Sequence, residues 1–427
     1  MKIFNEIAFA APDILLPKEN IDLSKWAVIA CDQYTSEIDY WNKVEANVGD
    51  APSALRAVLP EVYLPLETPE QQELRLKNIK ETIDKYLADG IWQDGKEGFI
   101  VIDRSTPVHK SRKGLVAAFD LEQYSYVPGN TALIRATEGT VLSRIPPRVK
   151  IRANARVELP HIMILIDDPE GSVVEKAWNS AEASSVAPCY DTNLMENAGH
   201  IKGYFLSSDS EEATNVVNAL KALKGDVEGK MLFAVGDGNH SLASAKAHWD
   251  NVKKDLSEED RLTHPARYAL AEIVNIHDSG LDFEPIHRVV FGISRESFIE
   301  KAKAHFSANG LTVSDTKTGA KQEFVITSPD GNDLYMSMTN PPHSLAVGSV
   351  QMFIDEMNYD VDYIHGEDSV RKLAEDATKS VGILMPEISK NAFFDTISKE
   401  GVFPRKTFSM GEAFEKRFYL EAKRIDG

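Results

Sequence analysis

The chain has 427 residues, of which 43% are hydrophobic and 26% are charged, proportions typical of a globular protein. Its 47 basic and 66 acidic residues give a net charge of −19. Because such an acidic surface repels phosphate groups and anionic lipids, the composition argues against nucleic acid and membranes as partners.

The length exceeds what one ordinary hydrophobic core supports, so we expect more than one domain. Cys31 and Cys189 lie far apart and match no metal-binding spacing, which predicts no structural metal and fits a reducing cytoplasm. Pro12, Asp13 and Pro17 interrupt the first apolar run, so we expect no signal peptide. No stretch approaches the ~20 apolar residues that span a bilayer, and we therefore expect a cytoplasmic protein.

Predicted helices and strands alternate along the first two thirds of the chain. A short apolar run at 27–30 predicts a strand that ends at Asp32, and residues 68–90 predict a helix with a capping box. The elements expected next are strands at 98–103 and 114–126, a helix at 146–157, a strand at 161–166, a helix at 171–182, a strand at 203–206, a helix at 210–223, a strand at 231–235, a helix at 239–254 and a strand at 266–276. This alternation predicts an α/β fold with some parallel strand pairing.

The pattern changes after about residue 290. Residues 328–332 read Ser-Pro-Asp-Gly-Asn between two strand-like runs, which predicts a hairpin. Residues 367–378 and 387–399 predict helices on either side of a strand at 381–385. We therefore expect an α/β domain over residues 1–290 and a smaller α+β domain over residues 291–427.

The most informative motif follows the strand expected at 231–235. Gly236 and Gly238 permit positive φ and a close backbone approach to a ligand, and a helix begins directly afterwards. The unpaired amides and the dipole of a helix N-terminus attract anions. Asp237 and His240 add a carboxylate and a titratable imidazole to the same turn. The alternative is an ordinary strand-to-helix turn with a structural histidine.

The run Gly-Asp-Gly-Asn-His-Ser at residues 236–241 resembles the bacterial and archaeal family called domain of unknown function 1015, which carries apolar-Asp-Gly-His-His-Arg at a strand end. Asn239 replaces a histidine of that pattern and Ser241 replaces its arginine. The other matching pieces are Arg-Ala-Thr-Glu-Gly-Thr at 135–140, Leu-Pro-His at 159–161, Asp-Asp-Pro-Glu at 167–170, Ile-His-Arg-Val at 286–289 and Pro-Arg-Lys-Thr at 404–407.

The turn is also similar to the phosphate-binding turn of ParB-type nucleotidases, sulfiredoxin and free serine kinases. This resemblance implies a ParB/sulfiredoxin-like α/β core and a site that handles phosphate. Because Ser241 replaces the family's arginine, other cations must neutralise the phosphate charge, and a local basic block supplies them. If 146–157 is helical, Arg148, Arg152 and Arg156 share one face, where guanidinium groups suit phosphate. The alternative is a solvated face paired with neighbouring carboxylates.

Several further side chains are candidates for chemistry. Glu138 is the only carboxylate between Glu122 and Glu158, and we expect it to act as a general base or a ligand. We expect Asp237 to act as a base or a Mg²⁺ ligand and His240 to bind phosphate or shuttle a proton. The residues expected to bind phosphate are Arg135, Arg144, Arg148, Gly236, Gly238, Asn239, Ser241 and Arg288. Other candidates, each with a structural alternative, are Asp32, His161, His287 and Lys406.

These observations favour an enzyme that handles a phosphate group, namely a nucleotide-dependent kinase or phosphatase of a small metabolite such as serine or another hydroxy or amino acid. The alternatives are a non-catalytic sensor of a nucleotide or phosphorylated metabolite and, against the acidic charge, a ParB-like nucleic-acid protein. Nucleotide-bound Mg²⁺ would need only one or two protein carboxylates. The expected partner is therefore a small phosphorylated ligand, and the oligomeric state is left open.

Overall fold

The computed structural model describes residues 1–140, 145–153, 155–404 and 406–427. These form two compact units, of which unit 1 comprises Met1–Leu281 and Glu412–Gly427 and unit 2 comprises Asp282–Gly411. The chain thus crosses from unit 1 to unit 2 and back.

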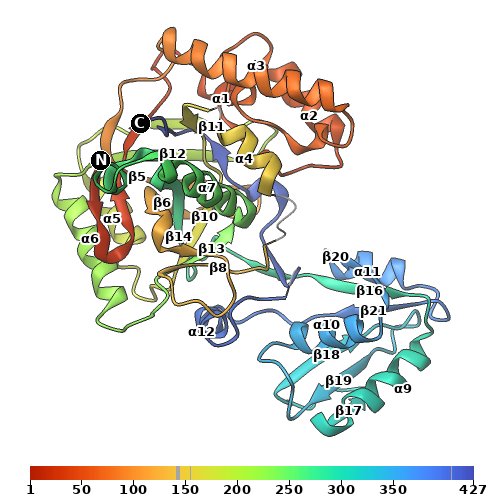
Figure 1. The fold of residues 1–427 in the computed structure, drawn as a ribbon. Helices are drawn as coiled ribbons and strands as arrows, with labels where there is room; N and C mark the ends of the chain where they lie inside the picture. Colours follow the sequence, from red (N-terminus) through yellow and green to blue (C-terminus); the bar gives the residue numbers. More distant parts are fainter. Residues whose placement is uncertain (141–144, 154, 405) are drawn as a thin grey trace. The chain divides into compact units, whose positions relative to one another are not determined.

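Unit 1 is a mixed α/β structure, as the sequence predicted (Figure 1). Its strands are β1 (Lys2–Phe4), β2 (Phe9–Ala11), β3 (Asp13–Leu15), β4 (Val28–Ile29), β5 (Lys96–Ser105), β6 (Lys113–Asp120), β7 (Tyr124–Ser125), β8 (Ile134–Ala136), β9 (Val157–Glu158), β10 (Met163–Ile166), β11 (Tyr190–Asn193), β12 (His200–Ser207), β13 (Phe233–Asp237), β14 (Tyr268–Asn275), β23 (Phe418–Tyr419) and β24 (Ala422–Arg424). Its helices are α1 (Leu23–Trp26), α2 (Ile38–Val48), α3 (Pro69–Ala88), α4 (Ile145–Ala153), α5 (Val174–Ala183), α6 (Glu211–Lys224), α7 (Asn239–Val252) and α8 (Glu258–Thr263).

The large sheet of unit 1 has the strand order β7-β8-β13-β10-β14-β6-β5-β3-β24-β9. The motif strand β13 lies between β8, to which it is parallel, and β10, to which it is antiparallel. Strand β10 is in turn parallel to β14. The expected parallel pairing is therefore confirmed, within a sheet that also contains antiparallel pairs.

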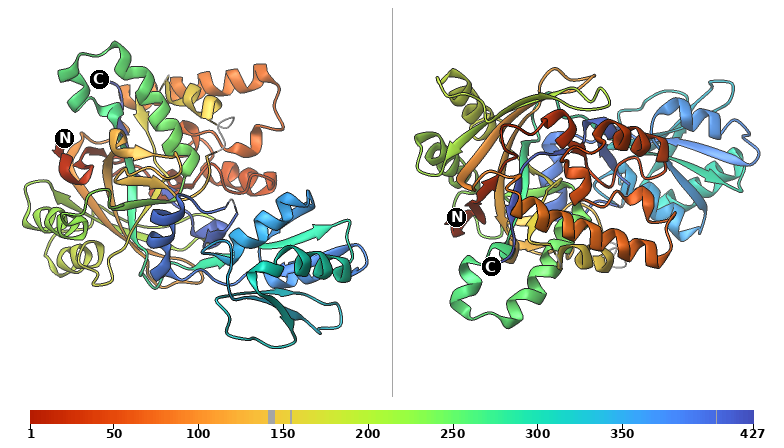
Figure 2. Two further views of the ribbon diagram at one scale, coloured as in Figure 1. Left: turned by 60° about the horizontal axis from the view of Figure 1, so that its bottom comes forward. Right: turned by 90° about the horizontal axis from the view of Figure 1, so that it is seen from above.

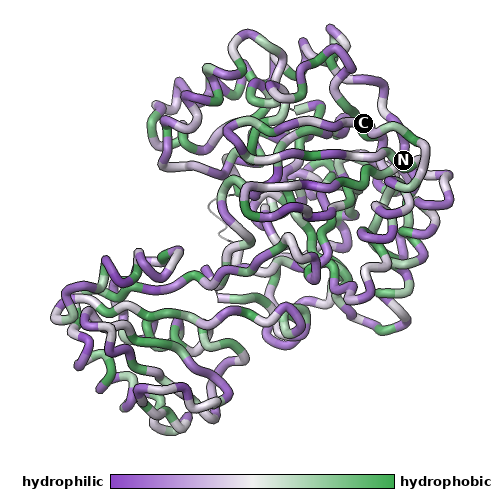
Figure 3. Tube along the Cα trace, turned by 180° about the vertical axis from the view of Figure 1, so that it is seen from behind, coloured by the Kyte–Doolittle hydropathy of each residue, from purple (hydrophilic) through white to green (hydrophobic). Residues whose placement is uncertain are grey.

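Apolar side chains cover both faces of this sheet because they alternate along its central strands. Phe99 and Val101 of β5 join one core with side chains from α5, α6 and α7. Ile100 and Ile102 join a second core with side chains from α2, α3 and β23. Figure 2 shows α5 and α6 side by side, and Figure 3 shows hydrophobic residues along the inner strands. Helix α7 therefore packs its apolar side into the first core and begins at the end of β13.

Most predicted elements of unit 1 are confirmed, and the capping box is a clear case. The Thr68 hydroxyl accepts the amide of Gln71 at 3.4 Å, and the Gln71 side chain accepts the amide of Thr68 at 2.8 Å, at the start of α3. The helix expected at 146–157 is α4, which ends at Ala153. It is shorter because Val157–Glu158 pairs as strand β9 with β24, a partner more than two hundred residues away.

Unit 2 has its own sheet, with the strand order β17-β19-β18-β21-β16-β20. Its strands are β15 (Phe283–Pro285), β16 (His287–Phe291), β17 (Leu311–Ser314), β18 (Gln322–Ile326), β19 (Leu334–Met338), β20 (Asp360–Ile364), β21 (Ser380–Leu384) and β22 (Phe408–Met410), and its helices are α9 (Arg295–His305), α10 (Ala346–Glu356), α11 (Glu367–Leu373) and α12 (Lys390–Glu400). Val290 of β16 packs with α9 and α10, whereas Val289 packs with α11, so helices cover both faces.

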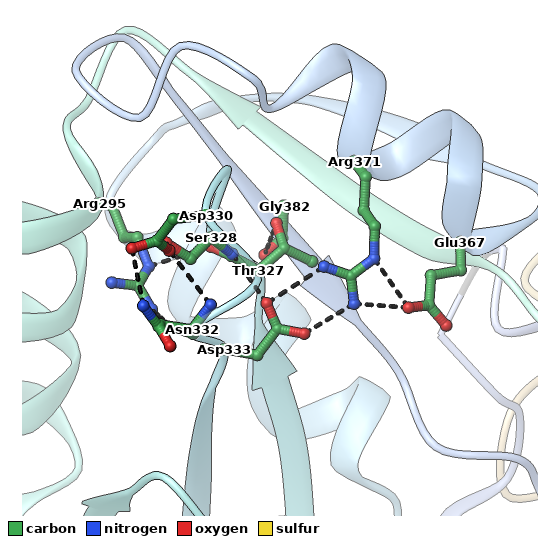
Figure 4. Close-up of polar contacts among 9 residues, drawn as sticks. All are labelled: Arg295, Thr327, Ser328, Asp330, Asn332, Asp333, Glu367, Arg371 and Gly382. Atoms are coloured by element: carbon green, nitrogen blue, oxygen red, sulfur yellow. Dashed lines mark hydrogen bonds and ion pairs between the residues drawn. The ribbon is translucent and has the colours of Figure 1, made fainter.

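The predicted hairpin in unit 2 is formed by β18 and β19, and two arginines fix its loop (Figure 4). Arg295 donates to the carbonyls of Thr327 and Asn332, both at 3.0 Å. Arg371 of α11 binds Asp333 with both terminal nitrogens, at 2.6 and 3.1 Å. The two guanidinium groups therefore tie the hairpin loop to α9 and α11.

The observed division differs from the expected domains in two ways. The expected boundary after residue 290 lies within β16 of unit 2, and residues Glu412–Gly427 return to unit 1. They return because Phe418, Tyr419 and Ala422 are buried in the second core of unit 1. No helix in the described part of the chain combines the length and apolar character needed to cross a bilayer.

Candidate functional site

The predicted strand, turn and helix are all present at residues 233–252. Strand β13 ends at Asp237, Gly238 has φ +79°, and α7 begins at Asn239. A Cβ on Gly238 would lie 3.1 Å from the Cα of Ile162, so the backbone conformation favours glycine and the space for a side chain is tight. The turn is therefore packed tightly against the chain that leads into β10.

Asp237 forms an ion pair that the sequence did not predict. Its Oδ2 lies 3.1 Å from Lys416 Nζ, and its Oδ1 accepts the amide of Gly238 at 2.8 Å. Burial by itself raises the pKa of the carboxyl, but Lys416, His161 and the Gly238 amide outweigh it and lower the pKa below its usual value. Asp237 is therefore a carboxylate at neutral pH.

Two buried arginines position the segment that carries Lys416. Arg104 donates to the carbonyl oxygens of Lys416 at 2.6 Å and Phe414 at 2.7 Å, and Arg112 donates to that of Glu415 at 2.9 Å. Burial, followed by repulsion from Arg112, lowers the pKa of Arg104 to about 9. The backbone around Lys416 is thus fixed to the ends of β5 and β6, and its ammonium is held beside the turn.

His161 links four separate segments of unit 1. Its Nδ1 lies 2.8 Å from the hydroxyl of Tyr419, and its Nε2 lies 2.9 Å from Oγ of Ser241. Oδ2 of Asp32 is 3.6 Å from the same Nε2, and the amide of Cys31 donates to the Tyr419 hydroxyl at 3.1 Å. Three of the predicted residues, Asp32, His161 and Ser241, are therefore brought together, and Tyr419 joins them from the C-terminal segment.

Arg148 lies near this group through an ion pair with Glu61. Burial raises the pKa of Glu61, Arg148 lowers it and Asp32 raises it again, with a net upward shift. The amide of Glu61 also donates to the carbonyl of Cys31 at 2.8 Å. A guanidinium group is thus placed at the edge of the site, already associated with one carboxylate.

Asn239 has a structural role for its side chain. Its Oδ1 accepts the amide of Thr137 at 3.2 Å, and its Nδ2 donates to the carbonyl of Val235 at 3.4 Å. The first residue of α7 therefore ties the end of β8 to the end of β13. Glu138 is half-buried and directly follows Thr137, so it lies one residue from this link. His240 is also half-buried, and its carbonyl accepts the Ser244 hydroxyl at 2.7 Å.

Other predicted cations are bound to partners outside the turn. Arg135 donates to the carbonyl of Ala132, just before β8, at 2.9 Å, and to the carbonyl of Gly229, just before β13. Arg152 pairs with Glu158, and Arg156 pairs with Asp426 at 2.8 Å. The described arginines of the expected stripe thus each pair with a carboxylate, the alternative that the sequence left open. Arg144 lies outside the described residues.

The remaining candidates belong to unit 2. Nδ1 of His287 accepts the amide of Met385 at 3.0 Å, and burial lowers the pKa of this histidine. Arg288 is fully buried in β16, where burial lowers its pKa to about 10. Lys406 is exposed and has φ +57°. All three residues belong to unit 2, whereas the turn at 236–241 belongs to unit 1.

No group of three or more His, Cys, Asp or Glu side chains in the described part of the chain could hold a metal ion. Asp237 is moreover engaged by an ammonium group and an amide. The described residues thus fit no dedicated metal centre. A Mg²⁺ ion carried by a nucleotide would draw most of its ligands from phosphate and water.

The sequence had no local signal for Lys416 or Tyr419. Both lie in a segment without a recognisable motif, and their contacts with Asp237 and His161 are formed across more than 170 residues. Lys416 and Tyr419 therefore join the site only through the tertiary structure.

Comparisons with known proteins add a family. The sequence profile of the family described as "Protein of unknown function (DUF1015)" matches residues 14–357. No curated protein matches the chain. Among solved structures, the chain is similar to SbnI with a C-terminal truncation from Staphylococcus aureus, at 10% identity and a TM-score of 0.37, covering 69% of this chain and 82% of that one.

Two further solved structures are similar at the same level. A mutant of free serine kinase in complex with ADP has 10% identity and a TM-score of 0.37, covering 75% of this chain and 95% of that one. A conserved hypothetical protein from Pyrococcus furiosus has 9% identity and a TM-score of 0.33, covering 73% and 95%.

Proposed function

Since the chain belongs to the DUF1015 family, whose description assigns no activity, we propose from its own geometry that it is an enzyme that handles a phosphate group at the turn between β13 and α7. The observation that carries this proposal is the ammonium of Lys416, 3.1 Å from Asp237 at the start of α7. A helix N-terminus with a fixed cation beside it favours a bound oxyanion.

Lys416 supplies the charge that the family's arginine would provide at Ser241. Its side chain is only 11% exposed, so it interacts with an anion through a medium less polar than bulk water. Arg148 adds a second cation at the edge of the group. The negative charge of the ligand is therefore neutralised by Lys416 of the C-terminal segment and Arg148 of α4, and not by a residue of the turn.

The finer proposal is a nucleotide-dependent kinase or phosphatase that acts on a small hydroxy or amino acid such as serine. Phosphoryl transfer needs positioning and charge stabilisation more than covalent catalysis by the protein. Asp237 and Glu138 are the proposed bases, because Asp237 is held ionised just before α7 and Glu138 follows Thr137, which is bonded to the first residue of α7. His240 is proposed to contact the phosphate or move a proton.

The test is a thermal-unfolding screen with inorganic phosphate, ADP, ATP and phosphoserine. A ligand at 100 times its Kd adds about 2.7 kcal/mol of stability. We expect stabilisation of the native chain and its loss in Lys416→Met. Lys85→Met is the matched control, since it removes a lysine from a surface pair with Asp89.

Turnover then separates an enzyme from a sensor. We expect ³¹P NMR to show phosphate release or transfer with the stabilising ligand. Stabilisation without turnover would favour the non-catalytic sensor, and equal stabilisation of Lys416→Met and the native chain would place the anion elsewhere. If no phosphorylated compound stabilises the chain, the proposal is wrong.

A further inference from the structure

Tyr419, His161 and Ser241 form a chain of two hydrogen bonds. The first donor is the backbone amide of Cys31, which lies 3.1 Å from the Tyr419 hydroxyl and has no capacity to accept. The phenol oxygen is therefore the acceptor in that bond. The proton of the phenol faces two partners, Nδ1 of His161 and the sulfur of Cys31.

The next member is Nδ1 of His161, 2.8 Å from the phenol oxygen. Burial holds the pKa of Tyr419 well above its usual value, so the phenol keeps its proton and donates it. A ring nitrogen that accepts a hydrogen bond carries no proton of its own. With the phenol as the donor, the imidazole of His161 carries its proton at Nε2.

Asp32 supports the same proton position independently. Its Oδ2 lies 3.6 Å from Nε2 of His161, on the side away from Tyr419. A carboxylate favours a ring N–H that faces it over a bare lone pair. The N–H at Nε2 then has Oγ of Ser241 as its closest acceptor, at 2.9 Å.

From this chain we infer that Ser241 donates its hydroxyl proton to a non-bridging oxygen of the bound phosphoryl group and is not a nucleophile. The Nε2 atom already holds a proton and cannot take the one on Ser241. Oγ of Ser241 forms no other hydrogen bond with the described residues, so its proton is available to a ligand. His161 and Tyr419 are positioning residues for this donor.

This inference rests on the proposed function and narrows its ligand. A donor fixed in direction selects an oxygen that only accepts, as in a phosphoryl group, over a hydroxyl that must also donate. The serine therefore substitutes for the hydrogen-bonding part of the family's arginine, and Lys416 substitutes for its charge. The neutral donor, Ser241, lies in α7, whereas the cation, Lys416, lies in the C-terminal segment.

The first test is ¹⁵N NMR of the histidine rings in the full-length chain without ligand. We expect the Nε2–H tautomer for His161, assigned with His161→Gln, and a shift toward the Nδ1–H tautomer in Tyr419→Phe. Tyr268→Phe is the matched control, because it removes a buried phenol whose partner is the carbonyl of Leu262, at 2.8 Å, and not His161. An Nδ1–H tautomer or a doubly protonated ring in the native chain would overturn the inference.

The second test is a double-mutant cycle read by calorimetric binding of ADP and of inorganic phosphate. We expect Ser241→Ala and Tyr419→Phe each to weaken binding about 5- to 10-fold, as for loss of one hydrogen bond. The double variant should bind no more weakly than Ser241→Ala, because both changes act through one donor. Fully additive losses would contradict the shared donor.

The two tests separate this inference from the function. If the native chain binds neither ligand, the proposed function and the phosphoryl contact of Ser241 both fail, whatever the tautomer. If it binds both ligands but Ser241→Ala binds them equally well, only the inference fails.

Discussion

Asp237 and Lys416 set the charge of the site, and their effect on stability depends on pH. The lowered pKa of Asp237 means that its ionised form stabilises the fold. This contribution is present above the ordinary value of 3.8 and is lost as the pH falls through the lower value of the folded state.

Lys416→Met should therefore destabilise the chain mainly at neutral pH. Without the ammonium, burial raises the pKa of Asp237, and an unpaired charge costs about 1–3 kcal/mol. Urea unfolding from pH 3 to pH 7 should show a deficit that grows with pH. Adding Asp237→Asn should recover much of it, and a deficit that is independent of pH would contradict this account.

Glu138 is the residue whose proposed role is most sharply catalytic. Glu138→Gln keeps the size of the side chain and removes its charge, so turnover should fall by about 10²- to 10⁴-fold if it is the general base. Phosphate binding should survive, as measured by calorimetry. Unchanged turnover in both Glu138→Gln and Asp237→Asn would favour the sensor over the enzyme.

At the scale of one element, the turn into α7 depends on Gly238. Gly238→Ala combines a positive φ of +79° with a 3.1 Å approach to the Cα of Ile162, whose backbone cannot move aside easily. We expect a loss of unfolding free energy of about 2–3 kcal/mol, by thermal or urea unfolding.

Gly292→Ala is the control for that change. Gly292 has φ +78°, but a Cβ on it would have no neighbour within 4 Å, so only the backbone term of about 1 kcal/mol applies. Equal losses in the two variants would show that the contact with Ile162 has no energetic consequence.

Local patterns predicted the elements whose causes are local. The capping residues Thr68 and Gln71 predicted the start of α3, and the glycine turn predicted the start of α7. The end of α4 was placed too late because Val157 has a strand partner in β24 that no nearby residue indicates. Sequence patterns therefore predict caps and turns well, and predict poorly any boundary that depends on a distant strand.

For the whole molecule, the return of residues Glu412–Gly427 to unit 1 could not be predicted. Arg417 is buried between Glu272 and Glu421, and Tyr419 reaches His161, contacts that depend on the complete fold. This explains why the sequence alone pointed to Asp237, Ser241 and His161 as candidates but not to Lys416 and Tyr419, which contact Asp237 and His161 in the structure.

The same topology predicts different behaviour for the two units when they are separated. Unit 2 is one continuous segment with its own core, so residues 282–411 should unfold cooperatively when expressed alone. Residues 1–281 lack Arg417 and should not, because Glu272 then loses its buried partner. Circular dichroism during urea unfolding would check both, and a cooperative transition for residues 1–281 would contradict the role of the C-terminal segment.

The most direct test of the central claim is an experimental structure of the full chain with ADP or inorganic phosphate. We expect a phosphorus atom at the start of α7, with oxygens in hydrogen-bonding distance of Ser241 Oγ and Lys416 Nζ. A phosphate bound away from the turn, with Lys416 still paired only to Asp237, would contradict it.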